Sequence, residues 1–127
     1  MLIPPPVQHE IATQAPLIAY VPTRLAPGWR YASWTTTGDI LVITFAKAGK
    51  RIYFLVRRYH GNTCSVGSDK TFQMAGVKVY WNGSRAEQVA WRCIDHVQLS
   101  AVTSLPSNRF ADVGLGRMAA SGHRIRS

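Results

Sequence analysis

The fold is decided by residues 40–59, ILVITFAKAGKRIYFLVRRY, which contain two strand patterns on either side of a short turn. The first half, Ile40–Phe45, is a β-branched run. The second half, Arg51–Tyr59, alternates between apolar side chains on one side and basic or aromatic side chains on the other. Between them, Lys47–Lys50 supplies the glycine that a tight hairpin turn needs for its positive φ. The stretch therefore predicts an antiparallel hairpin with one buried face.

Similar strand signals continue on both sides of this hairpin. They cover residues 20–22, 29–34, 71–75, 77–81, 88–94 and 97–103. Gly76 and the pair Asn82-Gly83 mark turns between them. No strand–helix–strand alternation occurs, which excludes doubly wound folds.

After Pro106 the apolar period changes from that of a strand to that of a helix. Ser107 is a suitable N-cap and Gly122 a suitable stop. The predicted stripe on the helix contains Phe110, Val113, Met118 and Ser121. We therefore expect an α+β fold, a twisted antiparallel sheet of five to seven strands with one C-terminal helix packed on it.

The 127 residues are enough for one domain with its own core. Five of the seven prolines lie within the first 22 residues. Because proline fixes φ and removes a backbone donor, we expect residues 1–20 to form an extended arm. The β-rich domain should then span residues 21–122, followed by a basic tail at 123–127.

The chain is strongly basic, with 15 Lys and Arg against 6 Asp and Glu, a net charge of +9. Such a charge attracts nucleic acids and other anionic polymers. Aromatic residues are interleaved with arginines on the predicted strands, and one face could stack bases or sugar rings. The polyanion-binding candidates are Arg30, Arg57, Arg58 and Arg92. The alternative is a solvated basic surface over aromatic residues that belong to the core.

The two cysteines differ in their surroundings, since Cys64 lies in a polar loop and Cys93 in an apolar run. An even pair of this kind indicates one structural disulfide in an oxidising compartment. Two other interpretations stay open. His60, Cys64, Cys93 and His96 form an H-x3-C…C-x2-H set that could bind zinc. The other is a catalytic thiol next to His60 or His96, although a thiol on an apolar strand is expected to be unreactive.

Nothing else in the sequence points to catalysis. The six carboxylates are Glu10, Asp39, Asp69, Glu87, Asp95 and Asp112. No two of them are predicted on facing walls of a cleft, as a paired-carboxylate hydrolase requires. No G-x-S-x-G motif or phosphate-binding glycine loop occurs. We therefore expect a protein that is not an enzyme, has no catalytic residues and uses no cofactor.

No apolar stretch has the roughly 20 residues that a membrane span needs. The N-terminal residues MLIPPP lack the basic and apolar regions of a signal peptide. Either the chain is cytoplasmic with reduced thiols, or a leader has been removed. The cysteine placement favours the second, an extracytoplasmic or secreted protein.

Four short segments carry a resemblance to a known family: Val21–Trp29, Gly76–Trp81, Val89–Arg92 and the final Arg117–Ser121. They resemble an uncharacterised domain of extracytoplasmic lipoproteins and anti-sigma-factor ectodomains in Gram-positive bacteria. That domain typically begins with P-x-x-L-P-x-G-[WY], whereas Ala26 stands here where proline is usual. The resemblance covers about residues 20–125 and implies a surface sensory or binding module without catalytic residues.

The sequence thus predicts a non-enzymatic extracytoplasmic interaction module, stabilised by a disulfide between Cys64 and Cys93. Its partner would be an unknown protein or an anionic polymer. The alternatives are a binder of nucleic acid or polyanions that uses a basic, aromatic sheet face, and a small domain stabilised by zinc.

Overall fold

The computed structural model describes residues 2–83, 87–104 and 109–126, with the backbone alone for residues 109–113. These residues contain two helices and nine strands. They are α1 (Pro5–Gln14), β1 (Tyr20–Val21), β2 (Arg30–Thr37), β3 (Ile40–Lys47), β4 (Lys50–Arg58), β5 (Lys70–Met74), β6 (Val77–Gly83), β7 (Gln88–Ile94), β8 (Val97–Thr103), α2 (Arg109–Ala120) and β9 (His123–Arg124).

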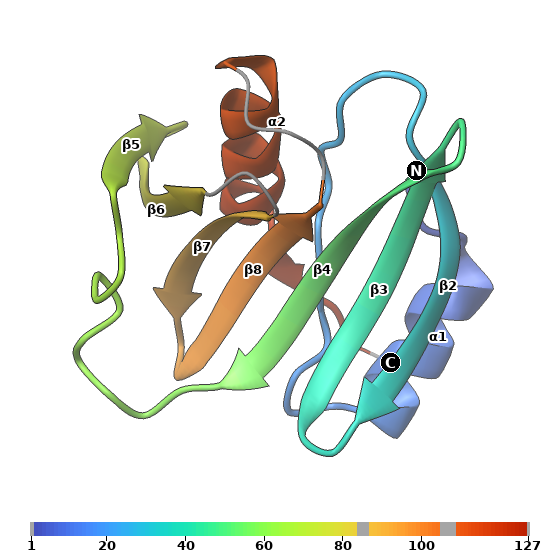
Figure 1. Cartoon of the computed structure of the whole chain (residues 1–127). Helices are drawn as coiled ribbons and strands as arrows, with labels where there is room; N and C mark the ends of the chain where they lie inside the picture. The colour runs from blue at the N-terminus through green and yellow to red at the C-terminus, as the bar shows by residue number, and fades with distance from the viewer. Residues whose placement is uncertain (1, 84–86, 105–108, 127) are drawn as a thin grey trace.

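Seven of the strands form one antiparallel sheet in the order β2-β3-β4-β8-β7-β6-β5, and β1 pairs with β9 in a separate two-stranded sheet (Figure 1). Helix α2 packs across β5, β6, β7 and β8. The predicted α+β class, the antiparallel sheet and the C-terminal helix are confirmed. Helix α1 was not expected.

Two-residue turns in which both residues have positive φ close three of the hairpins: Ala48–Gly49, Ala75–Gly76 and Asp95–His96. This turn geometry has the twist that matches the flanking strands. The predicted turns at Lys47–Lys50 and at Gly76 are confirmed.

The expected turn at Asn82-Gly83 is wrong, because both residues lie in β6 and pair with Val89 and Gln88 of β7. Gly83 is required here by packing. A Cβ atom at this position would overlap the ring of Trp81, so glycine lets that ring lie flat against the strand.

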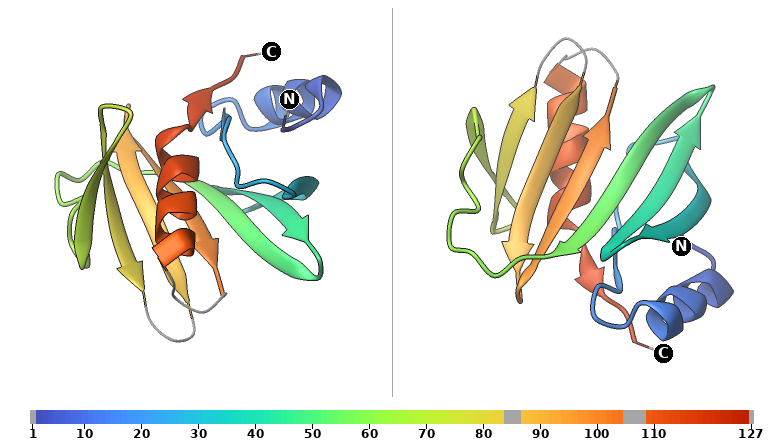
Figure 2. Two further views of the ribbon diagram at one scale, coloured as in Figure 1. Left: turned by 90° about the horizontal axis from the view of Figure 1, so that it is seen from above. Right: turned by 60° about the horizontal axis from the view of Figure 1, so that its bottom comes forward.

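The core lies between the sheet and the two helices, which are on the same side of it (Figures 1 and 2). Phe54 of β4 is fully buried and pairs with Ile43 of β3 on one side and with Ala101 of β8 on the other. Neighbouring positions follow the same period of two, so Ile52, Phe54 and Val56 all face the core.

The N-terminal segment is not the extended arm that its prolines suggested. Pro5 and Pro6 occupy the first turn of α1, where a helix does not need the amide hydrogens that proline lacks. Ile11 and Ala12 on α1 are buried in the same core as the sheet residues. Burial of this apolar surface stabilises the packing of the segment against the rest of the domain.

The C-terminal residues also differ from the expected free tail, since His123 and Arg124 pair with Val21 and Tyr20. Helix α2 ends at Ala120, two residues before the predicted stop at Gly122. A Cβ atom on Gly122 would collide with Leu99 and approach Phe54. Glycine is therefore needed there for the chain to pass close to the core.

The predicted apolar stripe of the helix is borne out at Met118, which is buried together with Leu115 and Ala119. The side chains of Phe110 and Val113 and the proposed cap Ser107 lie outside the described part of the chain. No helix among the described residues is sufficiently long and apolar to traverse a membrane.

The role of α1 in the core can be tested with the variant Ile11→Ala. Ile11 has no exposed surface, so its truncation should lower the free energy of unfolding by about 2–5 kcal/mol. The matched change Gln14→Ala, at an exposed position of the same helix, should alter it by less than about 0.5 kcal/mol. Chemical denaturation of the three proteins measures both. An unchanged stability of Ile11→Ala would show that α1 does not belong to the core.

Candidate functional site

The face of the sheet opposite the helices, here called the outer face, is basic. Arg51 and Arg57 of β4 lie on it, because they alternate with the buried core residues of that strand. The register places Arg30 of β2 and Lys78 of β6 on the same face. Among the described strand residues of the outer face there is no Asp or Glu, so its field is positive.

Apolar and aromatic side chains lie between these basic residues. They are half-buried and include Val42, Tyr53, Leu55, Tyr80, Val89 and Val102. A partly exposed apolar surface bordered by cations is a common composition for a binding face.

A disulfide joins Cys64 to Cys93, with an S–S distance of 2.08 Å and a Cα–Cα distance of 6.3 Å. The predicted bridge is confirmed. Its position differs from expectation, because Cys93 pairs with Gln98 on the outer face and is half-buried there. The bridge therefore holds the loop 59–69 against the outside of the sheet.

The loop covers Trp91, whose side chain is only 5% exposed although it lies on the outer face. The indole Nε1 of Trp91 donates a hydrogen bond to the Cys64 carbonyl at 2.6 Å. The Tyr59 hydroxyl lies 2.8 Å from the Thr63 hydroxyl and accepts a bond from the Thr63 amide at 2.9 Å. Asn82 donates its side-chain amide to the Gly67 carbonyl. These bonds fasten the loop at several points along its length.

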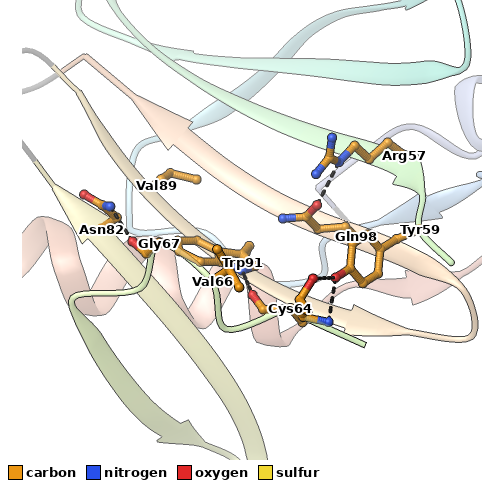
Figure 3. Close-up of a pocket in the computed structure, with 10 residues that line it drawn as sticks. Arg57, Tyr59, Cys64, Val66, Gly67, Asn82, Val89, Trp91 and Gln98 are labelled. Carbon is orange, nitrogen blue, oxygen red and sulfur yellow. Dashed lines mark hydrogen bonds between the residues drawn. The ribbon is translucent and has the colours of Figure 1, made fainter. Parts of the chain in front are cut away.

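A hollow of about 450 Å³ lies between this loop and the sheet (Figure 3). It is lined by Arg57, Tyr59, Thr63, Cys64, Val66, Gly67, Asn82, Val89, Trp91 and Gln98. Its volume is within the usual range of small-ligand sites. We call it the loop hollow.

Arg57 is the charged group of the loop hollow. Its Nε donates to Oε1 of Gln98 at 2.7 Å, which orients the guanidinium. Arg57 and Gln98 are cross-strand partners on β4 and β8. An oriented guanidinium is suited to bind a carboxylate or a phosphate in a bidentate manner.

The zinc alternative does not survive, since the sulfur atoms of Cys64 and Cys93 are bonded to each other and not free as thiolates. The two-residue turn is Asp95–His96, so His96 stands in the turn and not beside Cys93. The rings of His60 and His96 stack on each other at 5.8 Å. Among the described residues, no cluster of three potential ligands is placed to hold a metal ion. A catalytic role for either thiol fails for the same reason.

The four arginines proposed for polyanion binding do not form one patch. Arg30 and Arg57 share the outer face but lie at opposite ends of the β2–β4 ladder, opposite Ala46 and Ile40. Arg58 alternates to the helix side, where it lines another hollow with Asp39. Alternation within one strand is enough to separate Arg57 from Arg58. The positions of Arg30 and Arg92 relative to these two depend on the register between strands, which the sequence does not give.

Arg92 is on the core side of β7 and its Nη2 donates to the Gly122 carbonyl at 2.8 Å. Burial lowers the pKa of Arg92, while the negative charge of Asp95 acts to raise it. Its guanidinium thus holds the end of α2 near the sheet and is not part of the outer face.

The predicted aromatic platform is divided between the two faces. Trp81 is buried in the core and Tyr80 is half-buried on the outer face, as the alternation of a strand requires. Tyr31 and Trp34 pair with the buried residues Phe45 and Ile43 and face the core side. Burial, followed by the negative charge of Glu10, raises the pKa of the Tyr31 hydroxyl. Tyr53, Tyr80 and Trp91 are the aromatic residues of the outer face.

The described carboxylates lie in α1, turns and loops, and none lines the loop hollow. Glu10 differs from expectation, because it stands in α1 and not in an extended arm. It accepts a hydrogen bond from the indole of Trp34 at 2.9 Å. The described side chains that line the loop hollow are instead one cationic group, several hydrogen-bonding and aromatic groups, and the apolar Val66 and Val89.

Neither a protein-family model nor a curated protein sequence matches this chain.

Sequence inspection missed Asn82 and Gln98 as residues of the loop hollow. Asn82 was assigned to a turn, and Gln98 is an ordinary polar residue in an alternating strand. The signal that could have found Gln98 is its place directly across from Cys93, which becomes visible only once the register of β7 and β8 is known.

Reduction of the disulfide should destabilise the protein and release the loop. Removal of a bridge across 29 residues should lower the free energy of unfolding by about 3–4 kcal/mol. Trp91 should then become more exposed and its emission should shift to the red. The double variant Cys64→Ser/Cys93→Ser should not respond to reductant, and Trp91→Phe should abolish the shift. Equal stability with and without reductant would contradict a structural role for the bridge.

Proposed function

We propose that this protein is a non-catalytic binding module of an extracytoplasmic compartment, and that its outer face binds an anionic partner through the loop hollow. The disulfide that holds the loop over the sheet is the observation that carries this proposal.

The compartment is inferred from that bridge. The cytosol keeps thiols reduced, whereas structural disulfides persist in secreted and surface proteins. The bridge is one of the bonds that hold the loop over the loop hollow, so we expect the site to belong in an oxidising environment. The resemblance of four short segments to an extracytoplasmic domain family supports the same location.

The binding role is inferred from the groups that face the hollow. Arg57 offers guanidinium N–H groups beyond the one bonded to Gln98, and Val66 and Val89 offer apolar contact. A few oriented polar groups within an apolar wall are typical of ligand sites. Such groups are suited to hold a ligand, which supports binding in preference to catalysis.

The anionic character of the partner is inferred from charge. The outer face carries Arg30, Arg51, Arg57 and Lys78, and no Asp or Glu among its described strand residues. The whole chain has a charge of +9. An acidic protein surface or an acidic polymer is therefore attracted to this face over a distance of about a Debye length. Nucleic acid is one such polymer, and the same test separates it from carboxylate polymers.

The proposal can be tested with fluorescently labelled poly-L-glutamate and a single-stranded oligonucleotide as probes. Binding should weaken between about 50 and 200 mM salt. Arg57→Gln should weaken it about tenfold or more, since a hydrogen bond to a charged group contributes about 1.5–3 kcal/mol.

Arg58→Gln is the matched control, because it removes the same charge from the next residue of β4, whose side chain points to the other side. It should have a much smaller effect than Arg57→Gln. Equal losses in the two variants would show that only net charge matters, and absence of binding to both probes would refute the anionic partner. Tighter binding of the oligonucleotide than of poly-L-glutamate would favour nucleic acid.

A further inference from the structure

A second region with the features of a ligand site lies on the helix side, between α2 and the irregular segment Pro22–Gly28 that follows β1 (Figure 1). Two hollows of about 700 and 350 Å³ occur there. Both are lined by Thr23, Arg24 and Arg117, so the two guanidinium-bearing residues stand at their shared border. We call this region the arginine hollow.

The backbone of the arginine hollow is held in place by Ser121, just after α2. Ser121 Oγ accepts hydrogen bonds from the amides of Thr23 and Arg24, each at 3.1 Å, and donates to the Met118 carbonyl at 2.8 Å. The Thr23 hydroxyl donates to the Ser121 carbonyl at 3.1 Å. Arg24 is thereby fixed beside the last turn of α2, which contains Arg117.

The side chains of Arg24 and Arg117 are exposed, and no hydrogen bond or ion pair joins either guanidinium to another of the described residues. Lys47 is a third cation, bonded to a residue of the larger hollow, because its Nζ donates to the Pro27 carbonyl at 3.0 Å. The residues that line the two hollows include no Asp or Glu among those described.

The C-terminal end of α2 carries a partial negative charge, which disfavours the binding of an anion at this position. That end is equivalent to only about half an elementary charge. Two full positive charges, Arg24 and Arg117, therefore outweigh it, and the arginine hollow has the potential of an anion site.

The larger hollow continues from the arginines along an apolar wall. Leu2, Leu25, Ala26, Pro27 and Gly114 form this wall. Packing against the described residues does not require a glycine at position 114, since a Cβ atom built there would meet none of them within 4 Å. Gly116 in the same helix differs, because a Cβ there would lie 3.1 Å from Met74.

Glycine is among the poorest helix formers, so its presence at position 114 is unfavourable for α2. The bare backbone at Gly114 leaves room in the hollow that a side chain would fill. This second feature is independent of the charges and points to an occupant that extends from the arginines along the helix.

We propose that the arginine hollow binds a single-chain amphipathic anion. Its carboxylate or phosphate head lies between Arg24 and Arg117, and its apolar tail lies along Leu2, Leu25 and Gly114. Guanidinium groups bind such heads by paired hydrogen bonds, and a tail gains by leaving water. The ligand is either a free amphiphile or a lipid that a membrane supplies, since both present this chemistry.

Octyl phosphate and octanoate, each below its micelle concentration, are suitable probes for calorimetric titration. We expect octyl phosphate to bind at least tenfold more tightly than inorganic phosphate, because only the former has a tail. Arg24→Gln/Arg117→Gln should reduce the affinity at least tenfold. Arg126→Gln, at an exposed arginine of the C-terminal segment, is the charge-matched control and should change it less than twofold.

Gly114→Ala separates a ligand site from a merely structural one. It should raise the melting temperature by roughly 3–5 °C, because alanine favours the helix, and yet weaken octyl phosphate binding at least threefold. Unchanged binding by this folded variant would place the tail elsewhere and overturn the proposal.

Vesicles of anionic phospholipid distinguish the two sources of the ligand. Transfer of the lipid out of the vesicles, sensitive to Arg24→Gln/Arg117→Gln, indicates a membrane lipid, and binding of the monomeric probes alone indicates a free amphiphile. Absence of binding to both, or equal loss with Arg126→Gln, would refute the site. Arg57→Gln should leave octyl phosphate binding unchanged, so failure here is distinct from failure of the outer face.

Discussion

The pairing of β4 with β8 is the interaction on which the rest of the structure depends. In the sheet it is the one connection between the wing β2-β3-β4 and the wing β8-β7-β6-β5. On the core side it places Phe54 opposite Ala101, and on the outer face it places Arg57 opposite Gln98. A shift by a single residue would exchange the two faces, burying the arginine and exposing the phenylalanine. The large apolar side chains of β4 therefore fix the register that creates the loop hollow.

The disulfide extends this arrangement to a segment that has little apolar surface of its own. Loop 59–69 is polar and exposed for most of its length, and such a loop gains little from packing. The bridge compensates by limiting the freedom of the unfolded chain. With the loop held, Trp91 is covered from outside and the sheet acquires a hollow with a defined wall. Both the stability of the protein and the wall of the loop hollow therefore depend on the Cys64–Cys93 bond.

Glycine has two different roles in this protein, one in the core and one in a candidate site. Gly83 and Gly122 are needed because Trp81, Leu99 and Phe54 lie against them, and they serve the core. Gly114 has no such neighbour among the described residues and lines the larger part of the arginine hollow. The two proposed sites are also on opposite sides of the sheet, one made by a tethered loop and the other by a helix and an irregular segment. Their separation makes it possible to alter one without the other.

The sequence alone determined the fold class, the central hairpin and the cysteine pair, because these rest on local alternation, on glycine turns and on the chemistry of an even number of thiols. It did not determine α1, since prolines in a first helical turn look like those of an extended segment until Ile11 is seen in the core. Nor did it determine which arginines share a face. That depends on strand register, which is set by packing between residues as distant as Phe54 and Ala101. Only the tertiary structure shows that Arg24 lies beside Arg117 and Cys64 over Trp91. Contacts between residues so distant in the sequence produce no periodic pattern from which they could be predicted.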